Sequence, residues 1–265
     1  MLVIDGGAVK IGIDVDEPNV LMDSLMSSFP RRYIPDYRIT WNGSVDAIVK
    51  WVLVDKGFNV LGLELSDKLD RYFISSPPPK PYTSESPVFF LLQVLTRSFT
   101  KKGFIIFTDT ASIHVNGKTL LLMGYQHSGK STLTALSLYK GYIPLSTENT
   151  VVEFNGDAMR VVSGTPILVY DPRIEGLYGV KLPCDEETRH GYRIVNLDKH
   201  VPERREVLKE KPIVDHIYLL HCSYSSMGPD IEPIRGRKIK KTLWYFATSL
   251  IKGVDYYEQH PLNLM

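Results

Sequence analysis

A glycine-rich segment near the middle of this 265-residue chain carries the residue types of a phosphate-binding loop. Four residues separate Gly124 from the tripeptide Gly-Lys-Ser at 129–131, a spacing in which backbone N–H groups can surround phosphates. In such a loop Lys130 would reach the β- and γ-phosphate oxygens, and the Ser131 hydroxyl would bind Mg²⁺. The apolar run before the loop predicts a buried strand, and residues 132–140 predict a helix whose N-terminal end favours an anion. We therefore expect the chain to bind a nucleoside triphosphate.

The residues expected to bind the nucleotide lie in this loop and at the start of the helix after it. They are Gly124, Gln126, His127, Ser128, Gly129, Lys130, Ser131 and Thr132. The imidazole of His127 could donate to a phosphate oxygen or face solvent, and the sequence favours neither. ATP and Mg²⁺ are the expected cofactors.

The residues around the loop predict an α/β (α+β) fold with a mixed β-sheet at its core, because strands and hairpins dominate over a regular strand-helix alternation. Asn-Gly pairs at 116–117 and 155–156 predict two hairpin turns. The expected strands are 104–115, 119–123, 142–146, 149–154, 158–162, 166–170, 194–197 and 213–221, followed by an amphipathic helix at 239–251.

Residues 1–80 are expected to form a separate small α/β domain. Residues 2–15 predict a hairpin and residues 17–29 a helix. Residues 44–56 suit either a helix or a strand, whereas residues 59–65 predict a strand.

The boundary of this domain is expected in the proline-rich segment 75–87. Five prolines in thirteen residues cannot sustain a helix or a central strand. A second domain is expected over residues 86–265. It would open with a helix at 86–100, in which Pro87 occupies the first position.

Composition argues against two classes of partner. The net charge is +1, so no overall field directs the chain toward nucleic acid or an anionic membrane.

The two cysteines, Cys184 and Cys222, lack the spacing of a zinc site or a redox pair. With no apolar leader and no apolar run of membrane-spanning length, the sequence predicts a cytoplasmic protein with reduced thiols.

Two segments, 109–132 and 140–148, resemble the HPr kinase/phosphorylase-like family, whose fold type is shared with phosphoenolpyruvate carboxykinase. The resemblance covers residues 86–170. It implies a phosphate-binding loop between β-strands, a helix after the loop, and a later turn that brings carboxylates to the γ-phosphate and the metal.

The sequence departs from the family at two of three compared positions. Counted without gaps from Lys130, Asp109 falls where the family has a histidine, Thr147 falls on its catalytic aspartate, and Glu148 falls on its second aspartate. A threonine cannot accept the proton of a hydroxyl at neutral pH. The expected catalytic residues are therefore Glu148 and Asp109 together with Lys130, and the expected metal ligands are Ser131 and Glu148. The alternative is that both carboxylates are ordinary turn residues.

The resemblance implies a kinase that transfers the γ-phosphoryl group of ATP to a serine-type hydroxyl. A small metabolite such as free L-serine is favoured as acceptor over a serine in a protein, and a second copy of the chain remains a further partner. Because Thr147 replaces the aspartate, a nucleotide-binding regulatory module without catalysis is the alternative. An ATPase is less expected, because the apolar run 217–220 ends in His221 instead of a metal-binding aspartate.

Other chemically capable residues are given structural or solvated roles. We expect His114 and His216 on strands without a metal, and the acidic run 185–187 in solvent. Arg173 could bind a phosphate near a strand end. The basic cluster 235–241 could close over phosphates or simply begin a solvated helix.

Overall fold

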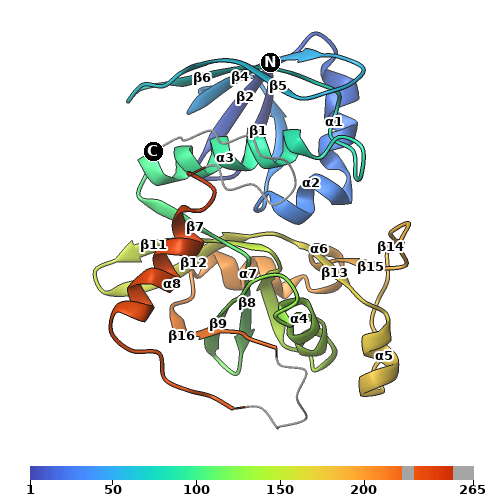
Figure 1. Ribbon diagram of the computed structural model, residues 1–265, viewed down its shortest axis with the longest axis vertical. Coiled ribbons are helices and arrows are strands. Elements are labelled where there is room, and N and C mark those ends of the chain that lie inside the picture. Colours follow the sequence, from blue (N-terminus) through green and yellow to red (C-terminus); the bar gives the residue numbers. More distant parts are fainter. Residues whose placement is uncertain (223–229, 253–265) are drawn as a thin grey trace.

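The computed structural model describes residues 1–222 and 230–252 and has a mixed α/β fold, as the sequence predicts. Two units are stacked along the longest axis (Figure 1). The N-terminal unit ends with the first long helix, α3, at residue 101, and the C-terminal unit begins at residue 104.

The N-terminal unit is a six-stranded sheet covered by helices. The strand order is β3-β1-β2-β4-β6-β5. β4 is parallel to both of its neighbours, β2 and β6, and the other three strand pairs are antiparallel. Its elements are β1 (Leu2–Asp5), β2 (Lys10–Asp14), α1 (Pro18–Met26), α2 (Ser28–Tyr33), β3 (Arg38–Trp41), β4 (Ala47–Leu53), β5 (Asn59–Glu64), β6 (Asp70–Ser76) and α3 (Ser86–Lys101).

The ambiguous segment 44–56 is a strand. Ala47, Val49 and Trp51 are buried, whereas Lys50 between them is exposed. This alternation is the period of a pleated strand with one face against a core. The indole N–H of Trp51 also donates to the backbone carbonyl of Ser76 at 3.1 Å, which joins β4 to the end of β6.

The single helix expected at residues 17–29 is instead two helices. α1 ends at Met26, because Ser27 has an extended backbone (φ −67°, ψ 164°) that no helix can continue. Ser27 then stands at the N-cap position of α2, while its hydroxyl donates to the carbonyl of Ser24 at 2.7 Å. This break turns α2 away from α1 and places two arginines, Arg31 and Arg32, in the last turn of α2.

The proline-rich segment is followed by a helix that packs on the N-terminal sheet. Apolar residues of α3, among them Leu91 and Leu95, share one core with Leu2 and Ile4 of β1. The same core continues into the C-terminal unit through Ile106. α3 lies between the N-terminal sheet and the C-terminal unit (Figure 1). The two units therefore share apolar packing.

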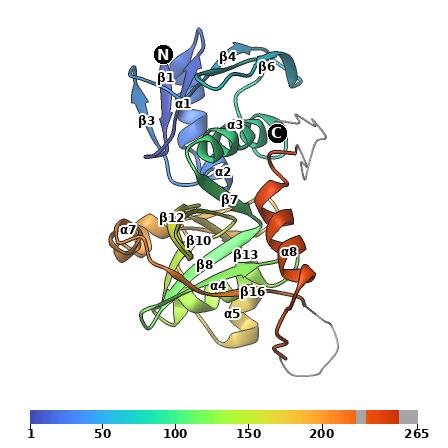
Figure 2. The ribbon, with the colours of Figure 1, turned by 90° about the vertical axis from the view of Figure 1, so that its left-hand side faces the viewer.

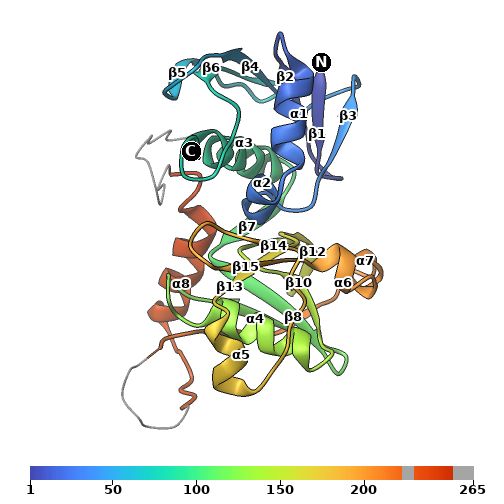
Figure 3. The same ribbon diagram turned by 90° about the vertical axis from the view of Figure 1, so that its right-hand side faces the viewer.

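Three small sheets form the C-terminal unit, in the orders β10-β8-β9-β16, β12-β11-β7 and β13-β15-β14. α7 and α8 lie on opposite sides of this unit (Figures 2 and 3). Its strands are β7 (Phe104–Thr108), β8 (Thr110–Val115), β9 (Lys118–Met123), β10 (Ile143–Ser146), β11 (Asn149–Asn155), β12 (Ala158–Gly164), β13 (Ile167–Tyr170), β14 (Glu186–Glu187), β15 (Arg193–Asn196) and β16 (Val214–Leu219). Its helices are α4 (Lys130–Tyr139), α5 (Arg173–Tyr178), α6 (Leu197–His200), α7 (Glu203–Lys209) and α8 (Arg237–Thr248).

The strand expected at residues 104–115 is broken at Asp109. This residue has a left-handed backbone (φ 51°), which a continuous strand does not allow. β7, before it, pairs with β11, whereas β8, after it, pairs with β9 and β10. The chain thus changes sheets at Asp109 and leaves this carboxylate at a corner between them.

A buried ion pair network fastens the segment after α2 to the C-terminal unit. The Arg204 guanidinium of α7 donates to Asp36 at 2.7 Å and to Asp198 at 2.8 Å, and the Arg204 side chain is 1% exposed. The side-chain amide of Asn149 donates to the backbone carbonyl of Tyr33 at 2.6 Å.

Within the described residues, no helix is both long and apolar enough to cross a bilayer.

Candidate functional site

The glycine-rich loop, residues 124–129, connects β9 to α4. The helix begins at Lys130, two residues earlier than the sequence predicts. Gly129 precedes it with a left-handed backbone (φ 94°), a conformation that favours glycine. At Gly124 the requirement is space, because a Cβ there would lie 2.3 Å from the hydroxyl oxygen of Ser128. Both glycines are therefore needed for the observed shape of the loop.

Lys130 folds back over this loop. Its buried ammonium donates to the backbone carbonyl of Gly124 and, at 3.1 Å, to that of Tyr125. Burial lowers the pKa of Lys130, and the negative charges of Asp109 and Glu148 act in the opposite direction. An ammonium held by neutral carbonyl oxygens at this position can exchange them for charged phosphate oxygens, which are stronger acceptors.

The backbone brings the two expected carboxylate residues to the same loop. The N–H of Gly124 donates to the carbonyl of Asp109 at 3.3 Å, and the N–H of Thr110 donates to the carbonyl of Glu148 at 2.9 Å. Asp109, Glu148 and Lys130 therefore meet where β8 begins and β9 ends. This arrangement provides two carboxylates and one ammonium beside a loop rich in backbone donors.

Glu148 has a partner that the sequence analysis missed. Arg32 of α2 donates to Oε1 of Glu148 from Nη2 at 2.8 Å and from Nε at 3.1 Å. The two residues are 116 positions apart, and no spacing rule connects them. In the sequence, the pair of adjacent arginines at 31 and 32 was the available signal for a role of this segment in binding an anionic group.

Thr147 does not point its hydroxyl into this cluster. The side chain is 2% exposed, and its hydroxyl donates to the backbone carbonyl of Ile167 at 2.7 Å. It also lies 3.1 Å from the hydroxyl of Thr165. Thr147 therefore has a structural role in this chain, whereas the side chain of the neighbouring Glu148 binds Arg32 and lies close enough for its charge to act on Lys130.

The remaining predicted nucleotide contacts differ in exposure. Ser128 is buried, and its hydroxyl has no hydrogen-bond partner among the described residues. Ser131 and Thr132 are partly buried in the first turn of α4, whereas Gln126 and His127 are exposed. The buried Ser128 hydroxyl of the loop thus keeps an unused hydrogen-bond donor.

Two further elements border the loop. β16 runs parallel to β9, and beyond its end the thiol of Cys222 donates to the carbonyl of Ser128 at 3.2 Å. From α8, the ring of Tyr245 lies 5.3 Å from that of Tyr125. Burial, followed by the charges of Tyr125 and Asp109, raises the pKa of Tyr245. α8 thus borders the loop through its aromatic residue Tyr245, whereas the sequence had suggested the basic residues 235–241 at the start of this helix.

Several other expectations are settled by hydrogen bonds elsewhere. Asp185 is not in open solvent: it accepts from Lys199 at 2.5 Å and lies 2.9 Å from Nε2 of His200. Arg173 is exposed and pairs with Asp171, two residues earlier in the chain, at 2.9 Å. The basic cluster 235–241 is exposed at the start of α8.

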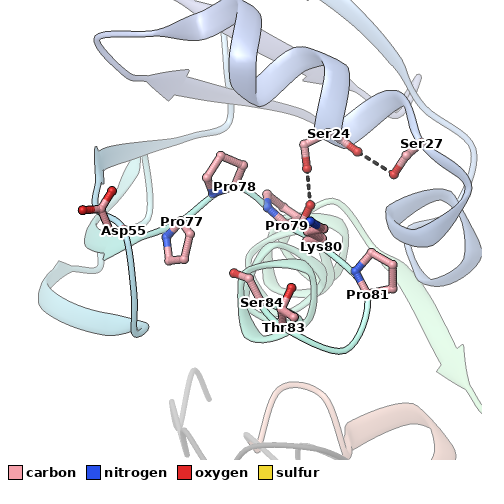
Figure 4. Close-up of a pocket in the computed structure, with 10 residues that line it drawn as sticks. All are labelled: Ser24, Ser27, Asp55, Pro77, Pro78, Pro79, Lys80, Pro81, Thr83 and Ser84. Carbon is pink, nitrogen blue, oxygen red and sulfur yellow. Dashed lines mark hydrogen bonds between the residues drawn. The ribbon is translucent and has the colours of Figure 1, made fainter.

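A cavity of about 490 Å³ lies in the N-terminal unit between α1 and the proline-rich segment (Figure 4). At its wall, the hydroxyl of Ser24 donates a hydrogen bond to the backbone carbonyl of Pro79. Four of its ten lining residues are prolines, which carry no N–H donor, four carry hydroxyl groups, and the charged ones are Asp55 and Lys80. This cavity offers no group of residues comparable to the one beside the glycine-rich loop.

The loop site fits magnesium bound together with phosphates better than magnesium held by protein alone. Among residues 1–222 and 230–252, no group of three or more His, Cys, Asp and Glu side chains is placed to hold a metal. Mg²⁺ is commonly bound by one or two protein oxygens plus substrate phosphates and water. Ser131 and Glu148 are the residues that would supply those oxygens.

Comparison with known proteins gives no further assignment. No protein-family model matches the chain, and no curated protein matches it.

Proposed function

We propose that this chain is an ATP-dependent kinase whose glycine-rich loop is a phosphate-binding loop in an HPr kinase-like or phosphoenolpyruvate carboxykinase-like fold. The observation that carries the proposal is the meeting of Lys130, Asp109 and Glu148 at a loop whose two glycines are required by its shape. The resemblance of residues 86–170 to that family supports the same conclusion.

Nucleotide binding would use the loop backbone, Lys130 and the hydroxyl of Ser128. Lys130 would exchange the carbonyls of Gly124 and Tyr125 for β- and γ-phosphate oxygens. Ser131 and Glu148 would hold Mg²⁺, which neutralises phosphate charge when it is bound.

Phosphoryl transfer depends mainly on positioning and on charge neutralisation. We assign Asp109 the role of orienting the acceptor hydroxyl and accepting its proton. The acceptor oxygen would form a bond to the γ-phosphorus while the bond to the bridging oxygen breaks, and ADP would leave. Asp109 lies at the corner between β7 and β8, and its carbonyl accepts from the N–H of Gly124 in the loop, which supports this assignment.

The acceptor would be a serine-type hydroxyl, and we favour a small hydroxy metabolite such as free L-serine over a serine in a protein. A regulatory module that binds nucleotide without turnover is the second candidate. The buried position of Thr147 in place of an aspartate favours this alternative.

ADP production with a panel of acceptors separates these functions. The purified chain is incubated with ATP, Mg²⁺ and free serine, threonine, small sugars or a serine-containing protein fraction. ADP formed solely in the presence of an acceptor supports a kinase. Nucleotide binding without turnover supports the regulatory module, and ADP formed without an acceptor indicates an ATPase.

A further inference from the structure

Arg32 is a residue of the N-terminal unit that reaches the loop site of the C-terminal unit. Both of its hydrogen bonds to Glu148 go to the same oxygen, Oε1, at 2.8 and 3.1 Å. Within the described residues, Oε2 of Glu148 accepts no hydrogen bond. The arginine therefore leaves one face of this carboxylate open toward other ligands.

The chain beside Arg32 is held in place by bonds to the C-terminal unit. Asn149, the residue after Glu148, binds the backbone carbonyl of Tyr33, the residue after Arg32, at 2.6 Å. Asp36 accepts from the buried Arg204 at 2.7 Å, and its N–H donates to the carbonyl of Gly164 at 3.0 Å. Arg32 thus reaches Glu148 from a backbone segment that hydrogen bonds attach to the C-terminal unit.

The charges of the site change sharply when a triphosphate enters. Without a nucleotide, the two cations Lys130 and Arg32 face the two anions Asp109 and Glu148. A triphosphate adds several negative charges, so the cations gain stronger partners than the carboxylates. A guanidinium is well suited to this exchange, because its planar fork matches phosphate oxygens as well as carboxylate oxygens.

We propose that Arg32 binds the terminal phosphate of the nucleotide and exchanges Glu148 for it when ATP is bound. The inference rests on the proposed function, since it assigns a further phosphate ligand at the same loop. ADP lacks the γ-phosphate, so in the ADP complex Arg32 would stay hydrogen-bonded to Glu148. The N-terminal unit would in this way make the site distinguish ATP from ADP.

Titration calorimetry with Mg-ATP and Mg-ADP, without acceptor, tests the assignment. Arg32→Ala should weaken ATP binding about tenfold or more, the range of a lost charge-assisted hydrogen bond, and leave ADP binding within about twofold. Arg31→Ala is the matched control, because Arg31 is adjacent in α2 and pairs with Asp198 at 3.2 Å. It should bind both nucleotides like the unchanged chain. Retained ADP binding also establishes that each variant is folded.

A double variant distinguishes direct binding of phosphate by Arg32 from an effect that Arg32 has only through its hydrogen bonds to Glu148. If Arg32 contacts phosphate, Arg32→Ala should still weaken ATP binding when Glu148 is already replaced by Gln. If Arg32 acts through Glu148 alone, it should have no effect in that background, and the proposal is overturned. Equal weakening of ATP and ADP by Arg32→Ala overturns it as well. Should Arg32→Ala fail to fold, Arg32→Gln is measured by the same criteria.

Failure of the kinase proposal gives a different binding result from failure of the Arg32 inference. If the unchanged chain binds neither nucleotide, the loop is not a nucleotide site, and the kinase proposal fails together with this inference. If the unchanged chain binds nucleotide and Arg32→Ala keeps its preference for ATP, the inference alone fails.

Discussion

The hydroxyl of Thr147 donates a hydrogen bond to the backbone carbonyl of Ile167 over 2.7 Å. This bond ties the turn between β10 and β11 to the start of β13, below the surface of the C-terminal unit. It also fixes the direction of the next residue, since Glu148 follows Thr147 directly and reaches the loop and Arg32. A buried structural threonine and a site carboxylate are thus adjacent in the chain.

Replacing Thr147 by the aspartate that the resembled family has at this position should lower the stability of the protein. Thr147→Asp would place a carboxylate against the carbonyl oxygens of Ile167 and Thr165, which cannot donate to it. We expect a loss of about 3 kcal/mol in the free energy of unfolding, as for other uncompensated buried charges, and no gain in turnover. Urea denaturation measures the change, and Thr147→Ser, which keeps the hydroxyl, is the control. A stable and more active Thr147→Asp variant would contradict the role given to Thr147.

Removal of the loop ammonium should abolish turnover. Lys130→Ala deletes the one buried ammonium that the described residues place on the loop, so the phosphates lose a charged ligand and the transition state loses neutralisation. The assay is ADP formation with an accepted hydroxyl compound. Lys140→Ala at the exposed end of α4 is the matched control and should be fully active. Turnover in Lys130→Ala close to that of the control would remove the basis of the kinase proposal.

Glu148 is expected to matter through its charge. Glu148→Gln keeps the size of the side chain but removes the charge of the proposed magnesium ligand, and we expect kcat to fall about a hundredfold or more. Glu153→Gln is the control, because Glu153 pairs with Lys211 on the surface of β11 at 3.0 Å. Raised magnesium should partly restore the Glu148 variant. Near-normal turnover would reject the assignment of this carboxylate.

The buried Arg204 should contribute strongly to stability. Arg204→Met leaves Asp36 and Asp198 without their shared cation, and we expect a loss of about 3–5 kcal/mol. Arg205 is the adjacent control: it also pairs with Asp198, at 3.0 Å, but its side chain is 67% exposed. Arg205→Met should change the free energy of unfolding by less than about 1 kcal/mol. Similar losses in both variants, measured in urea, would contradict the importance of burial.

How far the sequence could predict this structure depends on whether the signal was local. The glycine pattern, the apolar strand before it and the Asn-Gly turn at 116–117 are local features, and the strand, loop and helix follow in that order. The corner at Asp109 was missed, because residues 104–115 read as one apolar strand and a change of sheet depends on partners far along the chain.

The site shows the same limit. Asp109 and Glu148 were found through the resemblance, which fixes positions relative to Lys130. Arg32 could not be found in that way, because it lies in a part of the chain that the resemblance does not cover, and its contact with Glu148 arises from docking of α2. Tyr245 reaches the loop for a similar reason, through packing of α8 against Tyr125.

Asp185 should make stability depend on acidic pH. Burial alone would raise the pKa of Asp185, but hydrogen bonds from the Asn196 N–H, Lys199 and His200 outweigh it and lower the pKa to about 2. Since the folded pKa is below the unfolded value of 3.8, the ionised carboxylate stabilises the fold above that value. The contribution is lost as pH falls toward 2. It amounts to at most about 2 kcal/mol, which screening at the exposed Lys199 reduces toward about 1 kcal/mol.

The measurement is urea denaturation of the unchanged chain and of Asp185→Asn at pH 5 and pH 3. The variant should be less stable by about 1–2 kcal/mol at pH 5, and the difference should shrink to about half at pH 3, because below pH 3.8 the unfolded chain protonates this carboxylate while the folded chain still holds it largely ionised. Asp157→Asn in the exposed β11–β12 turn controls for removal of any carboxylate and should show little difference at either pH. A difference for Asp185→Asn that stays constant between the two pH values would mean that Asp185 stabilises the fold by packing and neutral hydrogen bonds, and not by its charge.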